Sequence, residues 1–422
     1  MKGFASIVVI IFILVLGVGV GILVMTSKKK GNDVSSLAPQ TANTRTPLAS
    51  NETCSPPGTP TCGPDGKPVK SNASAQNSAG GTTVSTLSQD VILKTIKLTG
   101  AGPQGLELDS KTGLVYVANN GSIISGCKGD TSKSGGQASL QAGANKLSIV
   151  DPSSGKETVS VPTDSGPIWP LVDNKRNVVY VAGSGNGKVA IHELGTGKKT
   201  DSINIGGRPH AFGLSESGVL IVSNTNDSTQ TFMSAVNVNT KQVIAHHKAP
   251  ELPHGIAFDS VKNVFYMVGV KNGTVAIIDA KTGEVKSTFA GTEGFGNSNM
   301  LAFSPSTRKL FISDSKTITS ITVVDVDSQK MIQSVGFTQT PSPTWGMAVD
   351  ETNGLLYAAL PNSNAVGVMD IKSLKPLALI PVDECPYAVR LDTERGLGFT
   401  ANQVNATVSV FDLKKVTSSI KK

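Results

Sequence analysis

The sequence predicts an all-β protein: a seven-bladed β-propeller of four-stranded antiparallel blades, preceded by one transmembrane helix and a disordered linker. Two observations predict this organisation. A phrase of fixed form recurs seven times between residues 103 and 392, and one long apolar run stands near the N-terminus. The composition agrees, because 44 glycines, 5% aromatic and 16% charged residues are typical of many short strands joined by turns.

The apolar run extends from Phe4 to Met25 without a charged residue, between Lys2 and the lysines at 28–30. At about 1.5 Å per residue, a helix of this length crosses a hydrocarbon core of ~30 Å. No small-residue cleavage site follows the run. We therefore expect residues 1–27 to be a transmembrane anchor or an uncleaved signal, with the membrane as its partner. The excess of a single charge after the run favours a cytoplasmic propeller.

Residues 28–90 are rich in Ser, Thr, Pro and Gly, as in "SPPGTPTCGPDGKP". Such a segment has too few bulky apolar side chains to offset the entropy lost on folding. We expect a disordered linker that holds the next domain away from the bilayer.

The repeated phrase reads Pro-x-Gly-apolar-x-apolar-Asp, and the first interval between its copies is 64 residues while the others are 42–46. A second apolar run and a third, ending in an acid or amide, follow each copy, and a weaker fourth run leads to the next. Four strands in a repeat of about 44 residues make a propeller blade. The propeller is expected over 91–422. The phrase ends at Asp109, Asp173, Ser215, Asp259, Ser304, Asp350 and Asp392.

The second runs, such as "VYVANN" and "VYVAGS", resemble the YVTN-type β-propeller repeats that are named for this phrase. The resemblance covers residues 91–413 and implies the propeller fold. It implies little about function, because propellers host many activities. WD-type repeats are disfavoured, since no Gly-His and Trp-Asp pair recurs.

The last repeat has no clear fourth strand after Val408–Leu413, whereas Val91–Leu98 ("VILKTIKL") has fourth-strand character and no repeat of its own. We expect Val91–Leu98 to complete the last blade, because joining the two ends of the chain closes the ring and leaves no open edge. The alternative is that "VTSSI", residues 416–420, is the outer strand.

The four cysteines have neither a C-x-x-C spacing nor histidines at zinc-ligand spacing. Cys127 lies in an insertion between the second and third strands of blade one, and Cys385 precedes the first strand of blade seven. These loops share a face, and the two blades are neighbours in a closed ring. The sequence therefore predicts a Cys127–Cys385 disulfide, with Cys54 and Cys62 as the other pair. A disulfide requires an oxidising compartment, so we expect an extracytoplasmic propeller at the cell membrane.

Aligning the seven phrases places one residue per blade at the mouth of the central channel, where propeller ligands bind. Six of the seven can form hydrogen bonds or stack. The expected ligand-binding residues are Gln104, His210, His254, Asn299, Trp345 and Tyr387, with Ile168 as the seventh position.

His210 and His254 occupy the same place in adjacent blades, but no carboxylate takes a matching position. We therefore predict no metal and no other cofactor. Glu107 and Arg390 are expected to form a structural ion pair between blades one and seven. No catalytic residue is assigned, because there is no Ser-His-Asp order, no paired carboxylates at known spacing and no phosphate-binding loop before a helix.

These features favour a binding or scaffold module that recognises a protein or small-molecule ligand on its funnel face. The first alternative is a propeller enzyme, lactonase-like, lyase-like or a quinone-linked dehydrogenase, with His210 and His254 as acid and base. The second is nucleic-acid binding, which the small net charge of +7 disfavours.

Overall fold

The computed structural model of the chain describes residues 84–123, 127, 143–225, 232–291, 298–314, 321–338 and 343–421. All of them belong to one compact unit, Ser78–Lys422. The predicted transmembrane anchor, residues 1–27, and residues 28–83 of the predicted linker lie outside the described ranges. Within those ranges, no helix is long and apolar enough to cross a membrane.

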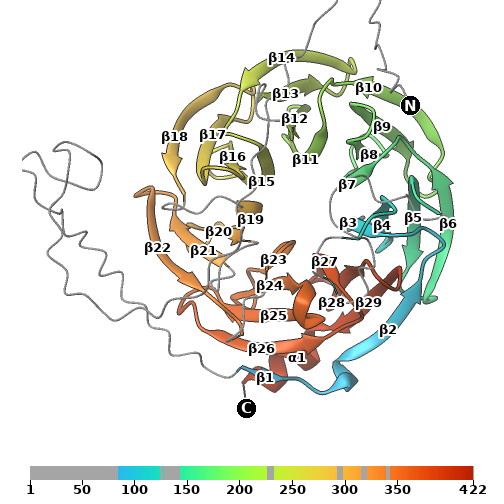
Figure 1. Cartoon of the computed structure of the whole chain (residues 1–422), viewed down its shortest axis with the longest axis vertical. Coiled ribbons are helices and arrows are strands. Elements are labelled where there is room, and N and C mark those ends of the chain that lie inside the picture. The colour runs from blue at the N-terminus through green and yellow to red at the C-terminus, as the bar shows by residue number, and fades with distance from the viewer. Residues whose placement is uncertain are drawn as a thin grey trace, which may run out of the picture. The chain divides into compact units, whose positions relative to one another are not determined.

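The described strands form seven sheets arranged around a central axis (Figure 1). We number the sheets as blades one to seven, in the order of the sequence repeats. Each blade has four antiparallel strands, and the first strand of each repeat lies nearest the axis. The predicted all-β, seven-bladed propeller is therefore confirmed.

The strands of the first three blades follow one another directly along the chain. Blade one contains β3 (Pro103–Leu108), β4 (Val115–Asn119), β5 (Lys146–Asp151) and β6 (Lys156–Pro162). Blade two contains β7 (Pro167–Asp173), β8 (Val178–Gly183), β9 (Lys188–Glu193) and β10 (Lys199–Asn204). Blade three contains β11 (Pro209–Leu214), β12 (Val219–Asn224), β13 (Phe232–Asn237) and β14 (Gln242–Lys248).

The remaining blades repeat this order, and the seventh takes its outer strand from the start of the domain. Blade four contains β15 (Pro253–Asp259), β16 (Val264–Gly269), β17 (Thr274–Asp279) and β18 (Val285–Ala290). Blade five contains β19 (Ser298–Ser304), β20 (Lys309–Asp314), β21 (Ile321–Asp325) and β22 (Lys330–Val335). Blade six contains β23 (Met347–Asp350), β24 (Leu355–Leu360), β25 (Ala365–Asp370) and β26 (Pro376–Pro381). Blade seven contains β27 (Pro386–Asp392), β28 (Leu397–Asn402), β29 (Thr407–Asp412) and β2 (Ile92–Lys97).

Burial explains why the second strands read as continuous apolar runs. A middle strand is covered on both faces by the neighbouring blades, so every residue of β4 is buried. The outer strand β14 alternates between exposed and half-buried residues. The acid that ends many third strands forms the next turn: Asp370 accepts hydrogen bonds from the backbone N–H groups of Lys372 and Ser373 at 3.0 and 2.6 Å.

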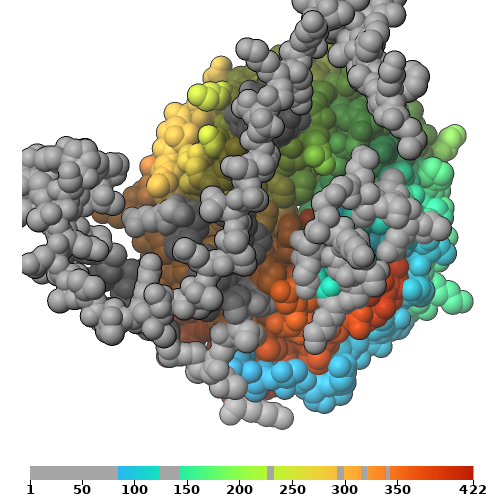
Figure 2. Space-filling model, in the orientation of Figure 1, coloured from blue at the N-terminus to red at the C-terminus, as the bar shows by residue number. Residues whose placement is uncertain are grey.

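The ring closes as the sequence predicts. Strand β2 pairs antiparallel with β29, with Lys94 opposite Val410 and Lys97 opposite Thr407. The alternative outer strand is wrong, because residues 416–420 belong to helix α1 (Leu413–Ile420), whose N-cap Asp412 accepts hydrogen bonds from Lys414 and Lys415. The space-filling view shows the N-terminal segment along the rim beside the C-terminal blade (Figure 2).

The segment before β2 also contacts the sixth blade. Strand β1 (Ser85–Thr86) pairs in parallel with β26, and a 3-10 turn, η1 (Gln89–Val91), leads from it into β2. Val91 of this turn is buried in one cluster with Val416 of α1. The two ends of the domain are thereby packed together at the outer edge of blades six and seven.

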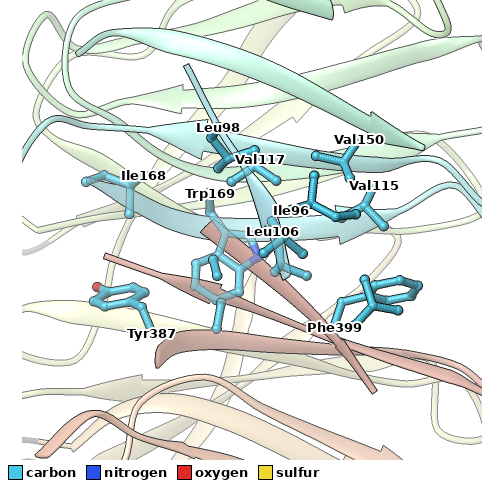
Figure 3. Close-up of a cluster of buried hydrophobic side chains, with 14 of the residues drawn as sticks. Ile96, Leu98, Leu106, Val115, Val117, Val150, Ile168, Trp169, Tyr387 and Phe399 are labelled. Carbon is cyan, nitrogen blue, oxygen red and sulfur yellow. The ribbon is translucent and has the colours of Figure 1, made fainter. Parts of the chain in front are cut away.

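A hydrophobic cluster joins blades seven, one and two, and the closing strand β2 contributes to it (Figure 3). Ile96 of β2, Leu106 of β3 and Phe399 of β28 contribute to it, and each is at most 3% exposed. Trp169 and Tyr387 extend the same cluster toward the axis. The contact between the first and last blades is thus a continuous part of the core.

Candidate functional site

The candidate site lies at the start of the inner strands, where the hydrogen-bond ladder is irregular. In six blades the register with the second strand shifts just after the first residue of the inner strand. A bulge of this kind redirects side chains. In blade six the equivalent residue, Trp345, lies just before β23. The predicted mouth residues are therefore held by a repeated backbone feature.

Most of the mouth residues are buried. The exposed fraction is only 3–8% for Gln104, Ile168, His210, Asn299 and Tyr387, whereas His254 and Trp345 are half-buried. The partly accessible positions of the mouth are therefore His254 in blade four and Trp345 in blade six, with the buried Asn299 of blade five between them. The sequence placed all seven positions on one ring and had no signal for this asymmetry.

His210 and His254 are brought together as a tilted ring pair, with ring centroids 3.6 Å apart and planes inclined by 30°. Burial lowers the pKa of both imidazoles, to about 4 for His254, although a hydrogen bond to the backbone of Asn299 opposes the shift there. The neighbouring His254 and Arg208 lower the pKa of His210 further. Both rings are therefore neutral near pH 7, and the Nδ1 atom of each is buried without a hydrogen-bond partner.

Trp345 and Tyr387 form the second ring pair of the mouth, stacked with centroids 4.8 Å apart and planes inclined by 26°. Backbone hydrogen bonds hold the two blades in this register, because Gly346 donates to the carbonyl of Tyr387 at 2.8 Å. Burial raises the pKa of Tyr387, so its phenol stays protonated. The pair therefore presents an uncharged aromatic surface.

The floor of the mouth is closed by side chains that the sequence reasoning missed. Trp169 and Met300, one residue beyond the mouth positions of blades two and five, are buried in one cluster with Ile168 and Tyr387. The signal was present in the aligned repeats. The other five blades have Gly or Ala at this place, so two large side chains there predict a filled axis.

Below this floor is a small cavity of about 50 Å³, lined mainly by apolar side chains and by Glu107 and Arg390. Arg390 donates from Nε to Glu107 at 3.0 Å, and its guanidinium lies 5.1 Å from the Trp169 ring centroid. The structure thus brings the two predicted partners together across blades one and seven. An ion pair beside an aromatic face satisfies both charges inside the channel.

The predicted cysteines also meet across the first and last blades. Cys127 and Cys385 are joined by a disulfide with a Cα–Cα distance of 5.7 Å, and both are buried. Cys385 has φ = 63°, the conformation adopted by Gly166 at the same place in blade two. It is followed directly by Pro386 and the mouth residue Tyr387. Cys54 and Cys62 lie outside the described residues.

The site contains two imidazole rings, and no carboxylate of the described ranges is paired with either of them. The interactions that it can offer are therefore hydrogen bonds and ring contacts. Neither histidine has a carboxylate partner among the described residues, and Glu107 of the inner strand of blade one is paired with Arg390. Within the same ranges, no group of three His, Cys, Asp or Glu side chains is placed to hold a metal ion. The buried His192 is separate, hydrogen bonded to Gly197 and Thr163.

The fold and site define a seven-bladed β-propeller with a closed, neutral channel mouth. No family model matches the chain, and the likeness to YVTN-type repeats remains a resemblance. No curated protein matches it either. Among solved structures, a chain of the hydrazine synthase of Kuenenia stuttgartiensis is similar, with a TM-score of 0.62 and 14% sequence identity. The match covers 75% of this chain and 97% of that one, and at this identity it shows the fold alone.

Proposed function

We propose that this protein is a membrane-anchored, extracytoplasmic binding module whose ligand or partner is recognised at the channel mouth. The observation that carries the proposal is the pair of half-buried aromatic side chains, His254 and Trp345, which are partly accessible at the channel mouth of a rigid seven-bladed frame. Such convergent groups around a propeller axis are typical of a binding site.

Binding is favoured over acid–base catalysis by the state of the histidines. A general base works best when its pKa lies near the working pH and a neighbouring group orients it. The pKa of His254 is about 4, that of His210 is lowered as well, and neither ring has an acid partner among the described residues. The lactonase-like, lyase-like and dehydrogenase alternatives therefore have no favourable observation in the site.

Native mass spectrometry of the full chain, purified in mild detergent from its own membranes, tests the binding proposal. We expect a co-purified mass that is retained by the wild type and lost on Trp345→Ala and His254→Ala. Ile332→Ala, on an exposed position of outer strand β22, is the matched control and should retain it. Retention by all three variants would place the ligand elsewhere.

The location is proposed on two features. The Cys127–Cys385 bond needs an oxidising compartment, and the uncharged run Phe4–Met25 is long enough to span a bilayer. Carbonate washing of membranes should leave the protein in the pellet, and protease added outside intact cells should reach the propeller. Release of the protein by carbonate would contradict a membrane anchor. Protection of the propeller from protease in cells that are proven intact would indicate that it lies on the cytoplasmic side.

A further inference from the structure

Three asparagines of the described ranges stand in the Asn-x-Ser/Thr pattern, or sequon, that accepts N-linked glycans: Asn120, Asn272 and Asn405. The pattern alone says little, because it also arises by chance in a chain rich in Asn, Ser and Thr. A glycan is bulky and hydrated, so the asparagine that carries it must lie on the surface of the folded protein. The surroundings of each side chain therefore decide which sequon can be used.

Two of the three asparagines have unsuitable surroundings. Asn120 is only 7% exposed, and its Oδ1 accepts a hydrogen bond from the hydroxyl group of Ser122 in the same sequon. Asn405 is exposed, but its Nδ2 donates to Asp383 at 2.6 Å, and the Thr407 hydroxyl donates to the other carboxylate oxygen at 2.7 Å. A charged acceptor strengthens both bonds, so the two reactive groups of this sequon stay engaged.

Asn272 has the surroundings that a glycan needs. It lies exposed in the turn between β16 and β17. Its Oδ1 accepts a hydrogen bond from the backbone N–H of Thr274 at 3.1 Å, which orients the side chain. Its Nδ2, the atom to which a glycan is attached, has no hydrogen-bond partner among the described residues. Modification at this atom therefore breaks no contact of the described structure.

The turn that holds Asn272 is on the face of the propeller that carries the channel mouth. Val270 donates to the carbonyl of Leu252 at 3.0 Å, and Gly269 is paired with Pro253, which directly precedes His254. A glycan on Asn272 would extend from this face, beside the loop that leads into His254, without occupying a mouth position.

We infer that Asn272 is a site of N-linked glycosylation. The co-substrate is an oligosaccharide joined to a lipid through a phosphate group. Nδ2 of Asn272 forms a bond to the anomeric carbon of the first sugar, and the bond from that carbon to the phosphate oxygen breaks. The lipid phosphate leaves with the electron pair, and one Nδ2 proton passes to a base of the transferring enzyme. The inference goes beyond the proposed binding function and rests only on the proposed extracytoplasmic location.

Peptide mass spectrometry of the full chain, purified from its own membranes, tests the inference. We expect the peptide that contains Asn272 to carry a saccharide mass. Asn272→Gln should remove this mass completely. Thr274→Val should remove it as well, although the asparagine and the β-branched shape of residue 274 are kept. Both variants should migrate faster than the wild type on a denaturing gel.

Asn204 provides the matched control. It is exposed, and its Oδ1 accepts a hydrogen bond from the backbone N–H two residues further on, at 3.3 Å, as that of Asn272 does. The residue two positions further on is Gly206, which has no hydroxyl group. The peptide that contains Asn204 should therefore carry no saccharide, and Asn204→Gln should migrate as the wild type does.

An unmodified Asn272 overturns the inference, and so does a saccharide that is retained in Thr274→Val or is also found on Asn204. The same digest separates this failure from that of the location. If Asn272 is unmodified while Cys127 and Cys385 are joined, the extracytoplasmic location stands and the glycosylation falls. If Asn272 is unmodified and both cysteines are free thiols, both fall. Trp345→Ala, which tests the binding function, should leave the saccharide in place.

Discussion

Removing the disulfide between the first and last blades should destabilise the propeller strongly without opening it. Cys127 and Cys385 are 258 residues apart in the sequence. The unfolded chain gains the entropy of a long open loop when this bond is lost, worth about 5 kcal/mol. Alanine is the replacement of choice, because both sulfurs are buried and serine would add unpaired hydroxyl groups. The unfolded fraction should rise roughly 10³–10⁴-fold.

The native ring should persist in this variant because β2 still pairs with β29 and Arg395 still donates to the carbonyls of Ser110 and Lys111 across the same blades. Guanidinium unfolding of the full chain, followed by fluorescence and far-ultraviolet circular dichroism, gives the free energy when the two transitions coincide.

Reductant provides the control. It should shift the wild-type midpoint to that of the double-alanine variant and leave the variant unchanged. A loss below about 1 kcal/mol, with the bond shown intact in the wild type by peptide mapping, would refute the loop-entropy reasoning. Free thiols at both positions in protein from its native compartment would remove the bond, and with it the argument for an extracytoplasmic location.

Three further predictions concern the closing strand, the histidines and the ion pair. Ile96→Ala, at a side chain 3% exposed in β2, should cost about 2–4 kcal/mol of unfolding free energy, whereas Leu93→Ala in the same strand, 44% exposed, should cost little. The folded-state pKa of His254, about 4, lies below its unfolded value of 6.5, so the contribution of this histidine to the unfolding free energy is complete above pH 6.5 and is lost as the pH falls toward 4. The loss is up to about 3 kcal/mol, reduced because water reaches part of the ring. The unfolding free energy of His254→Gln should therefore depend less on pH over this range than that of the wild type. Glu107→Gln or Arg390→Met alone should cost about 1–3 kcal/mol by leaving a half-buried charge unpaired, and the double variant should cost less than the sum of the two; additive losses would contradict a direct interaction.

The repeats made the fold predictable because each of the seven repeats shows the same four-strand pattern. Apolar runs such as "VYVANN" follow from burial between neighbouring blades, and seven copies leave no other architecture of that period. The closing strand was predictable for a topological reason, since one strand was missing at the end and one was spare at the start. Helix α1 was not, because "VTSSI" alternates weakly and its helix depends on the Asp412 cap and on burial of Val416.

The candidate site was predictable in position and not in geometry. Alignment places His210 and His254 on neighbouring blades, but their close ring contact depends on side-chain orientation, and their neutral state depends mainly on burial. The closed floor arises from Trp169 and Met300, two exceptions in a column of small residues. Strand β1 could not be predicted, since Ser85–Thr86 has no strand pattern and pairs only because β26 offers an open edge.

The contact between the first and last blades and the proposed binding positions, His254 and Trp345, occupy different parts of the mouth. Tyr387 and Gln104, on blades seven and one, are buried, and the first lies two residues beyond the disulfide at Cys385. The half-buried His254 and Trp345 lie on blades four and six. Covalent closure therefore fixes the buried part of the ring, whose task is packing. The Trp345–Tyr387 stack and the hydrogen bond from Gly346 to the Tyr387 carbonyl link the two parts, so a substitution at Tyr387 should disturb ligand binding through Trp345, whereas one at Gln104 should act on stability alone.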